Sequence, residues 1–255
     1  MPDARSDIPQ LHDLFAAFGL LTRLPIKVDP AKAHARGGRA AWAWPLVGLF
    51  IGAVAGALGM IAMAAGLGTG VAAFVVLGAG AALTGAMHED GLADSLDGLW
   101  GGWTPERRLA IMKDSQIGAF GVVGLIVSFG LRWQALVLLA DLMPLWLSAA
   151  AIGALSRVPM AALMALMPGA REKGLSARVG APSQRTALFA VGVGLVVALP
   201  LIGAATIPVA LTIGLVATGW AMIVKAKIGG QTGDILGAAQ QWSEMTGYLA
   251  LAIVL

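Results

Sequence analysis

Uncharged stretches as long as a membrane span recur along this chain. Residues 40–87 contain no Asp, Glu, Lys or Arg, which is enough for two helical spans of about 20 residues each, with a break at the glycines of 66–70. Two further spans fit at about 119–140 and 144–167, and residues 186–224 are long enough for two more. The pattern predicts an all-α fold, a polytopic membrane helical bundle of about six to seven transmembrane helices.

The two ends of the chain are less regular than the stretches between them. Residues 235–255 are interrupted by Gln240, Gln241 and Glu244, so this segment is either a seventh span or a helix packed at the interface. Residues 8–24 predict a short amphipathic helix lying on the membrane. We therefore expect one integral membrane domain over residues 1–255, in which 1–39 form a cytoplasmic or interfacial segment and 40–255 form the bundle.

The polar segments between the predicted spans carry most of the charge. Residues 1–39, 88–118, 168–185 and 225–234 hold 15 of the 17 Lys and Arg residues, and six spans before residue 225 place all four on one side. The positive-inside rule assigns that side to the cytoplasm, which predicts a multi-pass membrane protein whose polar segments face the cytoplasm. Apolar residues make up 58% and charged residues 12%, which excludes an ordinary cytosolic enzyme. The net charge of +3 is too small and scattered to favour nucleic acid binding.

Acidic residues concentrate just after the second predicted span. Asp90, Asp94 and Asp97 are spaced i, i+4, i+7, so on a helix that continues the span they lie within roughly 60° of one another. Like charges this close need compensation, and oxygen ligands without any cysteine favour Mg²⁺ over zinc. Mg²⁺ usually bridges to substrate phosphates, so the pattern predicts phosphoryl transfer at a metal site formed by these residues. An acidic, solvated helix end is the structural alternative.

Two further charged residues admit two interpretations each. Asp114 either brings another carboxylate to the region of the predicted metal site or caps the third predicted span. Arg157 lies inside the fourth predicted span, where its planar guanidinium either binds a phosphate or pyrophosphate or forms a structural ion pair.

Two polar segments are candidates for substrate contacts. Gly229, Gly230, Gln231, Thr232, Gly233 and Asp234 expose backbone N–H groups that suit a phosphate or nucleotide, although no Gly-Lys-Ser/Thr sequence of a Walker loop follows. In residues 168–185, Arg171 and Lys173 belong either to a basic loop facing the membrane or to a lid over an anionic substrate.

These motifs, in this order, resemble one family. They are Leu21-Thr22-Arg23-Leu24-Pro25, the run from His88 to Asp94 with Asp97-Gly98, Met112-Lys113-Asp114-Ser115, Ser156-Arg157, Arg171-Glu172-Lys173-Gly174, and the run from Gly229 to Asp234 followed by Leu236-Gly237-Ala238. Taken together they resemble the adenosylcobinamide-GDP ribazoletransferases, the cobalamin synthases of bacteria and archaea.

The resemblance implies a magnesium-dependent inner-membrane enzyme that joins adenosylcobinamide-GDP to alpha-ribazole or its 5'-phosphate and releases GMP. In this interpretation the ribazole hydroxyl attacks phosphorus, Asp97 or Asp114 takes its proton, and Arg157 stabilises the leaving phosphate. Arg23, Arg171, Lys173, Gly229, Gly230, Gln231, Thr232 and Asp234 become expected substrate contacts. A homo-oligomer is compatible with the sequence, which does not determine the oligomeric state.

Two rival functions remain for comparison. Asp94-Ser95-Leu96-Asp97-Gly98 matches the start of the CDP-alcohol phosphotransferase signature, but Gly101-Gly102 stand where that signature requires Ala-Arg. A transporter is the second rival, because Arg132 and Arg157 lie within predicted spans. The crowding of the acids on one side disfavours it.

Overall fold

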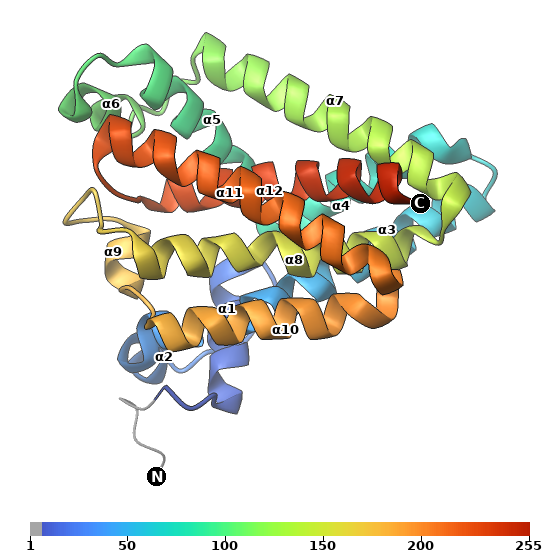
Figure 1. Cartoon of the computed structure of the whole chain (residues 1–255), viewed down its shortest axis with the longest axis horizontal. Helices are drawn as coiled ribbons and strands as arrows, with labels where there is room; N and C mark the ends of the chain where they lie inside the picture. Colours follow the sequence, from blue (N-terminus) through green and yellow to red (C-terminus); the bar gives the residue numbers. More distant parts are fainter. Residues whose placement is uncertain (1–6) are drawn as a thin grey trace.

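The computed structural model describes residues 7–255, and these are almost entirely helical (Figure 1). Within them, the one pairing of β type is an isolated bridge between Gly169 and Gln231. The helices, in order, are α1 (Leu11–Leu21), α2 (Pro30–Arg36), η1 (Gly37–Ala43), α3 (Trp44–Ala64), α4 (Gly68–Thr84), α5 (Met87–Gly101), α6 (Pro105–Ile111), α7 (Ala119–Leu142), α8 (Leu145–Leu166), α9 (Leu175–Val179), α10 (Gln184–Ile202), η2 (Gly203–Ala205), α11 (Thr206–Ile228) and α12 (Gly233–Val254).

The all-α membrane bundle predicted from the sequence is confirmed. Four continuous helical runs in the described chain are long and apolar enough to cross a membrane, and a bent pair formed by α4 and α5 makes a fifth candidate. The run Gln184–Ile228 folds back at η2, so α10 and α11 lie antiparallel (Figure 1). Helix α12 is not among the candidate spans, in keeping with the polar residues that interrupt it.

The polar segments gather at one end of the bundle. Helices α6 and α9 and the turn between α11 and α12 lie together at the left of Figure 1, whereas the α7–α8 and α10–α11 turns and the C-terminus lie at the right. Two predicted spans separate each polar segment from the next, so the chain returns to the same end of the bundle each time, as the structure shows. We call the left end the polar end.

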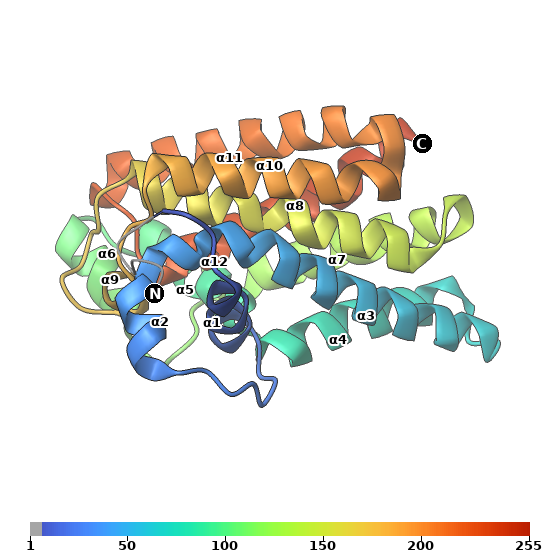
Figure 2. The ribbon, with the colours of Figure 1, turned by 90° about the horizontal axis from the view of Figure 1, so that it is seen from below.

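Helix α1 lies crosswise to the long helices, against the side of the bundle that carries α3 (Figures 1 and 2). Its buried Asp13 accepts two hydrogen bonds of 2.7 Å from Arg36 and one of 2.8 Å from the Trp42 indole. Burial alone raises the pKa of Asp13, but the hydrogen bonds from Arg36, Trp42 and the Gln10 backbone outweigh it and lower the pKa below its usual value. This ion pair fixes the crosswise helix to the start of the bundle.

Helix α8 lies at the centre of the bundle and packs closely on α3. A Cβ atom on Gly48 would lie 2.0 Å from the carbonyl oxygen of Gly153, and one on Gly52 would lie 1.9 Å from that of Ala149. A real Cβ atom cannot lie so close to an oxygen. The two helix backbones can approach this closely only because both positions are glycine.

The second predicted span does not continue through residue 87 as a single helix. Helix α4 ends at Thr84 and α5 begins at Met87, and the two axes differ by 90°. Gly85 and Ala86 adopt positive φ values of 68° and 56°, which breaks the helical path. The bend directs α5, and the acidic residues on it, toward the polar end.

Candidate functional site

A cavity of about 300 Å³ lies at the polar end, between α1, α5, α8, α12 and the segment around α9. Five residues predicted from the sequence as metal or substrate ligands line it, namely Asp90, Arg171, Lys173, Thr232 and Asp234. The remaining wall is mostly apolar and includes Leu20, Leu21, Trp44, Met87, Met160, Met164, Leu175, Val179 and Leu236. We call this space the polar-end cavity.

The carboxylates of the polar-end cavity come from two helices that pack closely. A Cβ on Gly91 would lie 2.8 Å from the carbonyl oxygen of Asp234, so the start of α12 rests directly on α5. Asp90 is exposed at this junction, and Asp94, one turn further along α5, lies within electrostatic range of both Asp90 and Asp234. Negative charge from α5 and α12 therefore converges on one region.

Positive charge reaches the same region from the segment before α9. One guanidinium nitrogen of Arg171 lies 3.0 Å from a carboxylate oxygen of Asp234, and another donates to the carbonyl oxygen of Leu109 at 2.9 Å. Lys173 is exposed at the rim of the cavity. Two cations of the 168–185 segment therefore lie beside the carboxylates of the cavity, and the lid over an anionic substrate stays a prediction.

Asp97 and Asp114 have other contacts. The buried carboxylate of Asp97 accepts hydrogen bonds from the backbone N–H groups of Gly118 at 2.7 Å and Gly121 at 2.9 Å. It caps α7, the role that the sequence had suggested for Asp114. Asp114 instead accepts from the backbone of Gln116 in an exposed turn. Neither carboxylate lines the polar-end cavity.

The predicted Mg²⁺ ligands form no complete metal site in this conformation. Within residues 7–255, no group of three or more His, Cys, Asp or Glu side chains is arranged to hold an ion. Mg²⁺ nevertheless needs only one or two protein carboxylates when substrate phosphates and water complete its shell. Asp90, Asp94 and Asp234 supply hard oxygen donors, so their chemistry fits this ion, whereas both oxygens of Asp97 are engaged with α7.

The glycine-rich segment serves mainly to start α12. Gly229 ends α11 with φ of 76°, and a Cβ on Gly230 would lie 2.3 Å from the carbonyl oxygen of Pro168. Gln231 exchanges backbone hydrogen bonds of 2.8 Å with Pro168 and Ala170, and the Thr232 hydroxyl caps α12. Thr232, Gly233 and Asp234 reach the cavity, whereas Gly229, Gly230 and Gln231 are not among the residues that line it.

Arg23 lies at the bend between α4 and α5. Its backbone N–H donates to the carbonyl oxygen of Leu83 at 2.8 Å, and its exposed side chain lies against Gly85. The structure places it beside the hinge that orients α5, outside the lining of the polar-end cavity.

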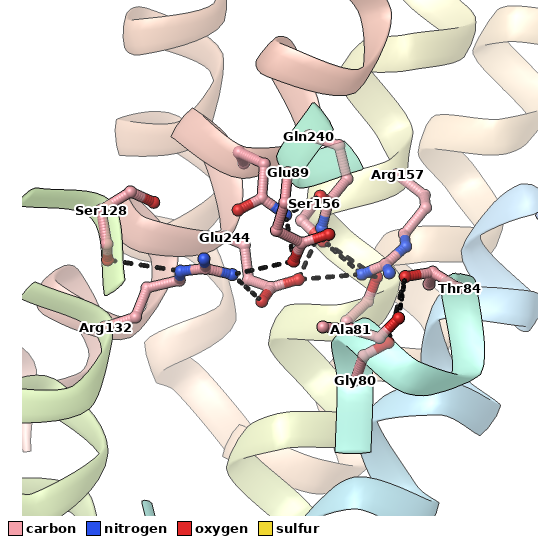
Figure 3. A network of polar contacts seen from close by, with 12 residues as sticks. Gly80, Ala81, Thr84, Glu89, Ser128, Arg132, Ser156, Arg157, Gln240 and Glu244 are labelled. Carbon is pink, nitrogen blue, oxygen red and sulfur yellow. Dashed lines mark hydrogen bonds and ion pairs between the residues drawn. The ribbon is translucent and has the colours of Figure 1, made fainter. Parts of the chain in front are cut away.

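Arg157 is in a separate charged region inside the bundle (Figure 3). It is 3% exposed, and its guanidinium lies 3.1 Å from a carboxylate oxygen of Glu244. Arg132 contacts the other oxygen of Glu244 at 3.1 Å and lies 3.8 Å from Glu89. We call these four residues the buried ion cluster. The ion-pair interpretation of Arg157 therefore fits the structure, whereas a phosphate contact in the polar-end cavity does not.

Polar neighbours complete the buried ion cluster. Gln240 donates to Glu244 and to the Ser156 hydroxyl, and Gln241 donates to Glu89 at 3.1 Å (Figure 3). His88 lines both the polar-end cavity and a cavity of about 20 Å³ beside the cluster. Glu244 and Glu89 were not predicted from the sequence as partners of the arginines. The signal was present in the spacing of Gln240, Gln241 and Glu244, which repeat on one side of α12.

The apolar wall of the polar-end cavity was also not predicted. Leu20, Trp44 and Met160 belong to α1, α3 and α8, and nothing in their local sequence distinguishes them from core residues. The crosswise position of α1 brings Leu20 to the acidic region, and the packing of the long helices brings Trp44 and Met160 there.

Comparison with known proteins gives a consistent family. Residues 13–252 match the family model described as cobalamin-5-phosphate synthase. An adenosylcobinamide-GDP ribazoletransferase of Bradyrhizobium diazoefficiens is 43% identical over 249 residues, covering 95% of this chain and 94% of the relative. Proteins with the same name from Sinorhizobium sp and Allorhizobium ampelinum are 41% and 40% identical, covering 94% and 96% of this chain and 96% and 98% of the relatives.

No solved structure matches this chain. The sequence relatives extend over nearly its full length, and the family match contains both the polar-end cavity and the buried ion cluster. The chain therefore belongs to the cobalamin-5-phosphate synthase family and is a transferase, as its motifs predicted.

Proposed function

We propose that this protein joins adenosylcobinamide-GDP to alpha-ribazole or its 5'-phosphate in a magnesium-dependent reaction that releases GMP. The observation that carries the proposal is the polar-end cavity, where carboxylates from α5 and α12 face Arg171 and Lys173 beside an apolar wall. A cavity of about 300 Å³ with this lining suits the diphosphate portion of adenosylcobinamide-GDP. The names of the relatives supply the identity of the donor and the ribazole acceptor.

The bond changes assign a role to each group of residues. The acceptor hydroxyl oxygen forms a bond to the phosphorus on the cobinamide side, while the bond from this phosphorus to the bridging oxygen of GMP breaks. Arg171 and Lys173 bind and orient the anionic diphosphate. Asp90 or Asp234 receives the hydroxyl proton, since these two carboxylates line the cavity whereas Asp94, Asp97 and Asp114 do not.

Asp90, Asp94 and Asp234 would hold Mg²⁺ together with the substrate phosphates. When bound, the ion neutralises charge on the transferring and leaving phosphates. The basic polar segments support a cytoplasmic orientation of this end in the inner membrane, where water-soluble substrates reach the cavity from the same side.

The test is a turnover assay on the purified protein in liposomes. Adenosylcobinamide-GDP and alpha-ribazole, or its 5'-phosphate, are supplied with and without Mg²⁺, and GMP and the cobalamin product are measured together. We expect both products in equal amounts and only with Mg²⁺. Absence of both with either acceptor, from protein that retains its helical circular dichroism, would refute the proposal. A CDP-alcohol substrate and an uptake assay then test the two rivals.

A further inference from the structure

A second cavity adjoins the polar-end cavity on the side of α1 and α2. Its volume is about 490 Å³, and Leu20, Trp44 and Val179 line both cavities. The rest of its lining comes mainly from α1, α2 and the segment between them and includes Ala33, His34 and Arg178. We call it the α1–α2 cavity.

The lining of the α1–α2 cavity differs in charge from that of the polar-end cavity. It is mostly aliphatic, its ionisable members are His34 and Arg178, and no carboxylate of the described chain lines it. A cavity of this volume is in the usual range for a small organic ligand. Its lining suits an apolar ligand that carries an anion, and it supplies no carboxylate ligand for Mg²⁺.

The two cavities together match the requirements of a reaction between two substrates. The donor carries a diphosphate, for which the polar-end cavity provides cations and metal-binding carboxylates. The acceptor carries an aromatic base and a ribose, with or without a 5'-phosphate. Leu20, Trp44 and Val179 line both cavities, so the two spaces adjoin one another, and transfer between two substrates requires adjoining sites.

We propose that the α1–α2 cavity binds the ribazole acceptor, and that Arg178, with His34, binds the acceptor's 5'-phosphate. This inference rests on the proposed function and adds the location of the second substrate and the residues that select it. The segment 171–179 then serves both substrates, with Arg171 and Lys173 on the donor and Arg178 on the acceptor.

The first experiment compares acceptors. For the wild-type protein and Arg178→Gln, kcat/KM is measured with alpha-ribazole 5'-phosphate and with alpha-ribazole. We expect the ratio of the two values to fall about tenfold in the variant, the effect of one lost charge-assisted hydrogen bond. Arg185→Gln is the matched control, because Arg185 is also exposed near this end but does not line the cavity. An unchanged ratio in Arg178→Gln, or an equal fall in Arg185→Gln, would overturn the role of Arg178.

The second experiment fills the cavity. Ala33→Phe adds a ring to its lining without touching the polar-end cavity. We expect the KM of both acceptors to rise at least tenfold and the KM of adenosylcobinamide-GDP to stay within twofold. An increase in the donor KM instead would assign the cavity to the donor, and no change in either would leave the cavity without a substrate; both overturn the inference. Wild-type protein that makes no product at all refutes the proposed function itself, so the two failures are distinguishable.

Discussion

The polar-end cavity and the buried ion cluster are both rich in charge, but their charges are used differently. In the buried ion cluster two arginines face two glutamates, and Glu244 contacts both guanidinium groups at 3.1 Å. At the polar-end cavity Arg171 engages one carboxylate, Asp234. Asp90 in the lining and Asp94 one turn further along α5 form no ion pair within residues 7–255. Compensated charge holds helices together, whereas uncompensated charge beside a cavity is available to a ligand.

Charge within a membrane bundle therefore does not by itself mark the catalytic centre. Arg157 is the most conspicuous intramembrane cation next to Arg132, and both serve to join α7, α8 and α12 through Glu244. The location of such a residue relative to a cavity decides its role. Four substitutions test the comparison, in order of expected effect.

The largest effect is expected for Glu244→Gln. It leaves two buried guanidinium groups with much less compensating charge, so the free energy of unfolding should fall by about 3–5 kcal/mol. Thermal unfolding in detergent measures the loss. The double variant Glu244→Met with Arg157→Met, which leaves Arg132 beside Glu89, should recover part of this stability. Full stability of Glu244→Gln alone would show that the cluster does not hold the bundle.

Asp94→Asn should have the opposite profile, with turnover reduced about a hundredfold or more and little change in thermal unfolding. The reason is that Asp94 has no ion pair to lose but contributes charge beside Asp90 and Asp234. Asp141→Asn, an exposed carboxylate at the far end of α7, is the control. Retained turnover in Asp94→Asn would exclude Asp94 as a metal ligand.

Asp97→Ala separates a capping role from a catalytic one. Loss of the hydrogen bonds to Gly118 and Gly121 should lower the free energy of unfolding by about 1–2 kcal/mol. Turnover per folded molecule should change much less than in Asp94→Asn. A hundredfold loss of turnover, with an unchanged free energy of unfolding measured without Mg²⁺, would instead restore Asp97 to the metal site that the sequence predicted.

The smallest effect is expected for Lys173→Gln. Lys173 is exposed at the cavity rim, where one charge contributes less than about 1 kcal/mol to binding. The donor KM should rise a few-fold at low salt, and the difference from wild type should shrink at high ionic strength because exposed charges are screened. A salt-independent effect would indicate a buried, direct contact.

Much of the architecture follows from the sequence alone. The uncharged stretches predicted the long helices, and the distribution of Lys and Arg predicted that the polar segments share one end. Helical periodicity also placed Asp90 and Asp94 on neighbouring turns of one helix, and Arg171, Lys173 and Asp234 were identified from motif and charge. These features depend on composition and local repeat, which any stretch of chain carries within itself.

The assembly of the site depended on contacts between distant segments. The bend at Gly85 and Ala86 turns α5 toward the polar end, and the close packing at Gly91 brings Asp234 beside it. Packing of α5 on α7 places Asp97 at the start of α7, and packing of α8 on α12 pairs Arg157 with Glu244. Helical periodicity determines which residues share a face of a helix. Which other helix covers that face depends on the packing of the whole bundle. The carboxylates that remain free for a ligand are therefore known only from the tertiary structure.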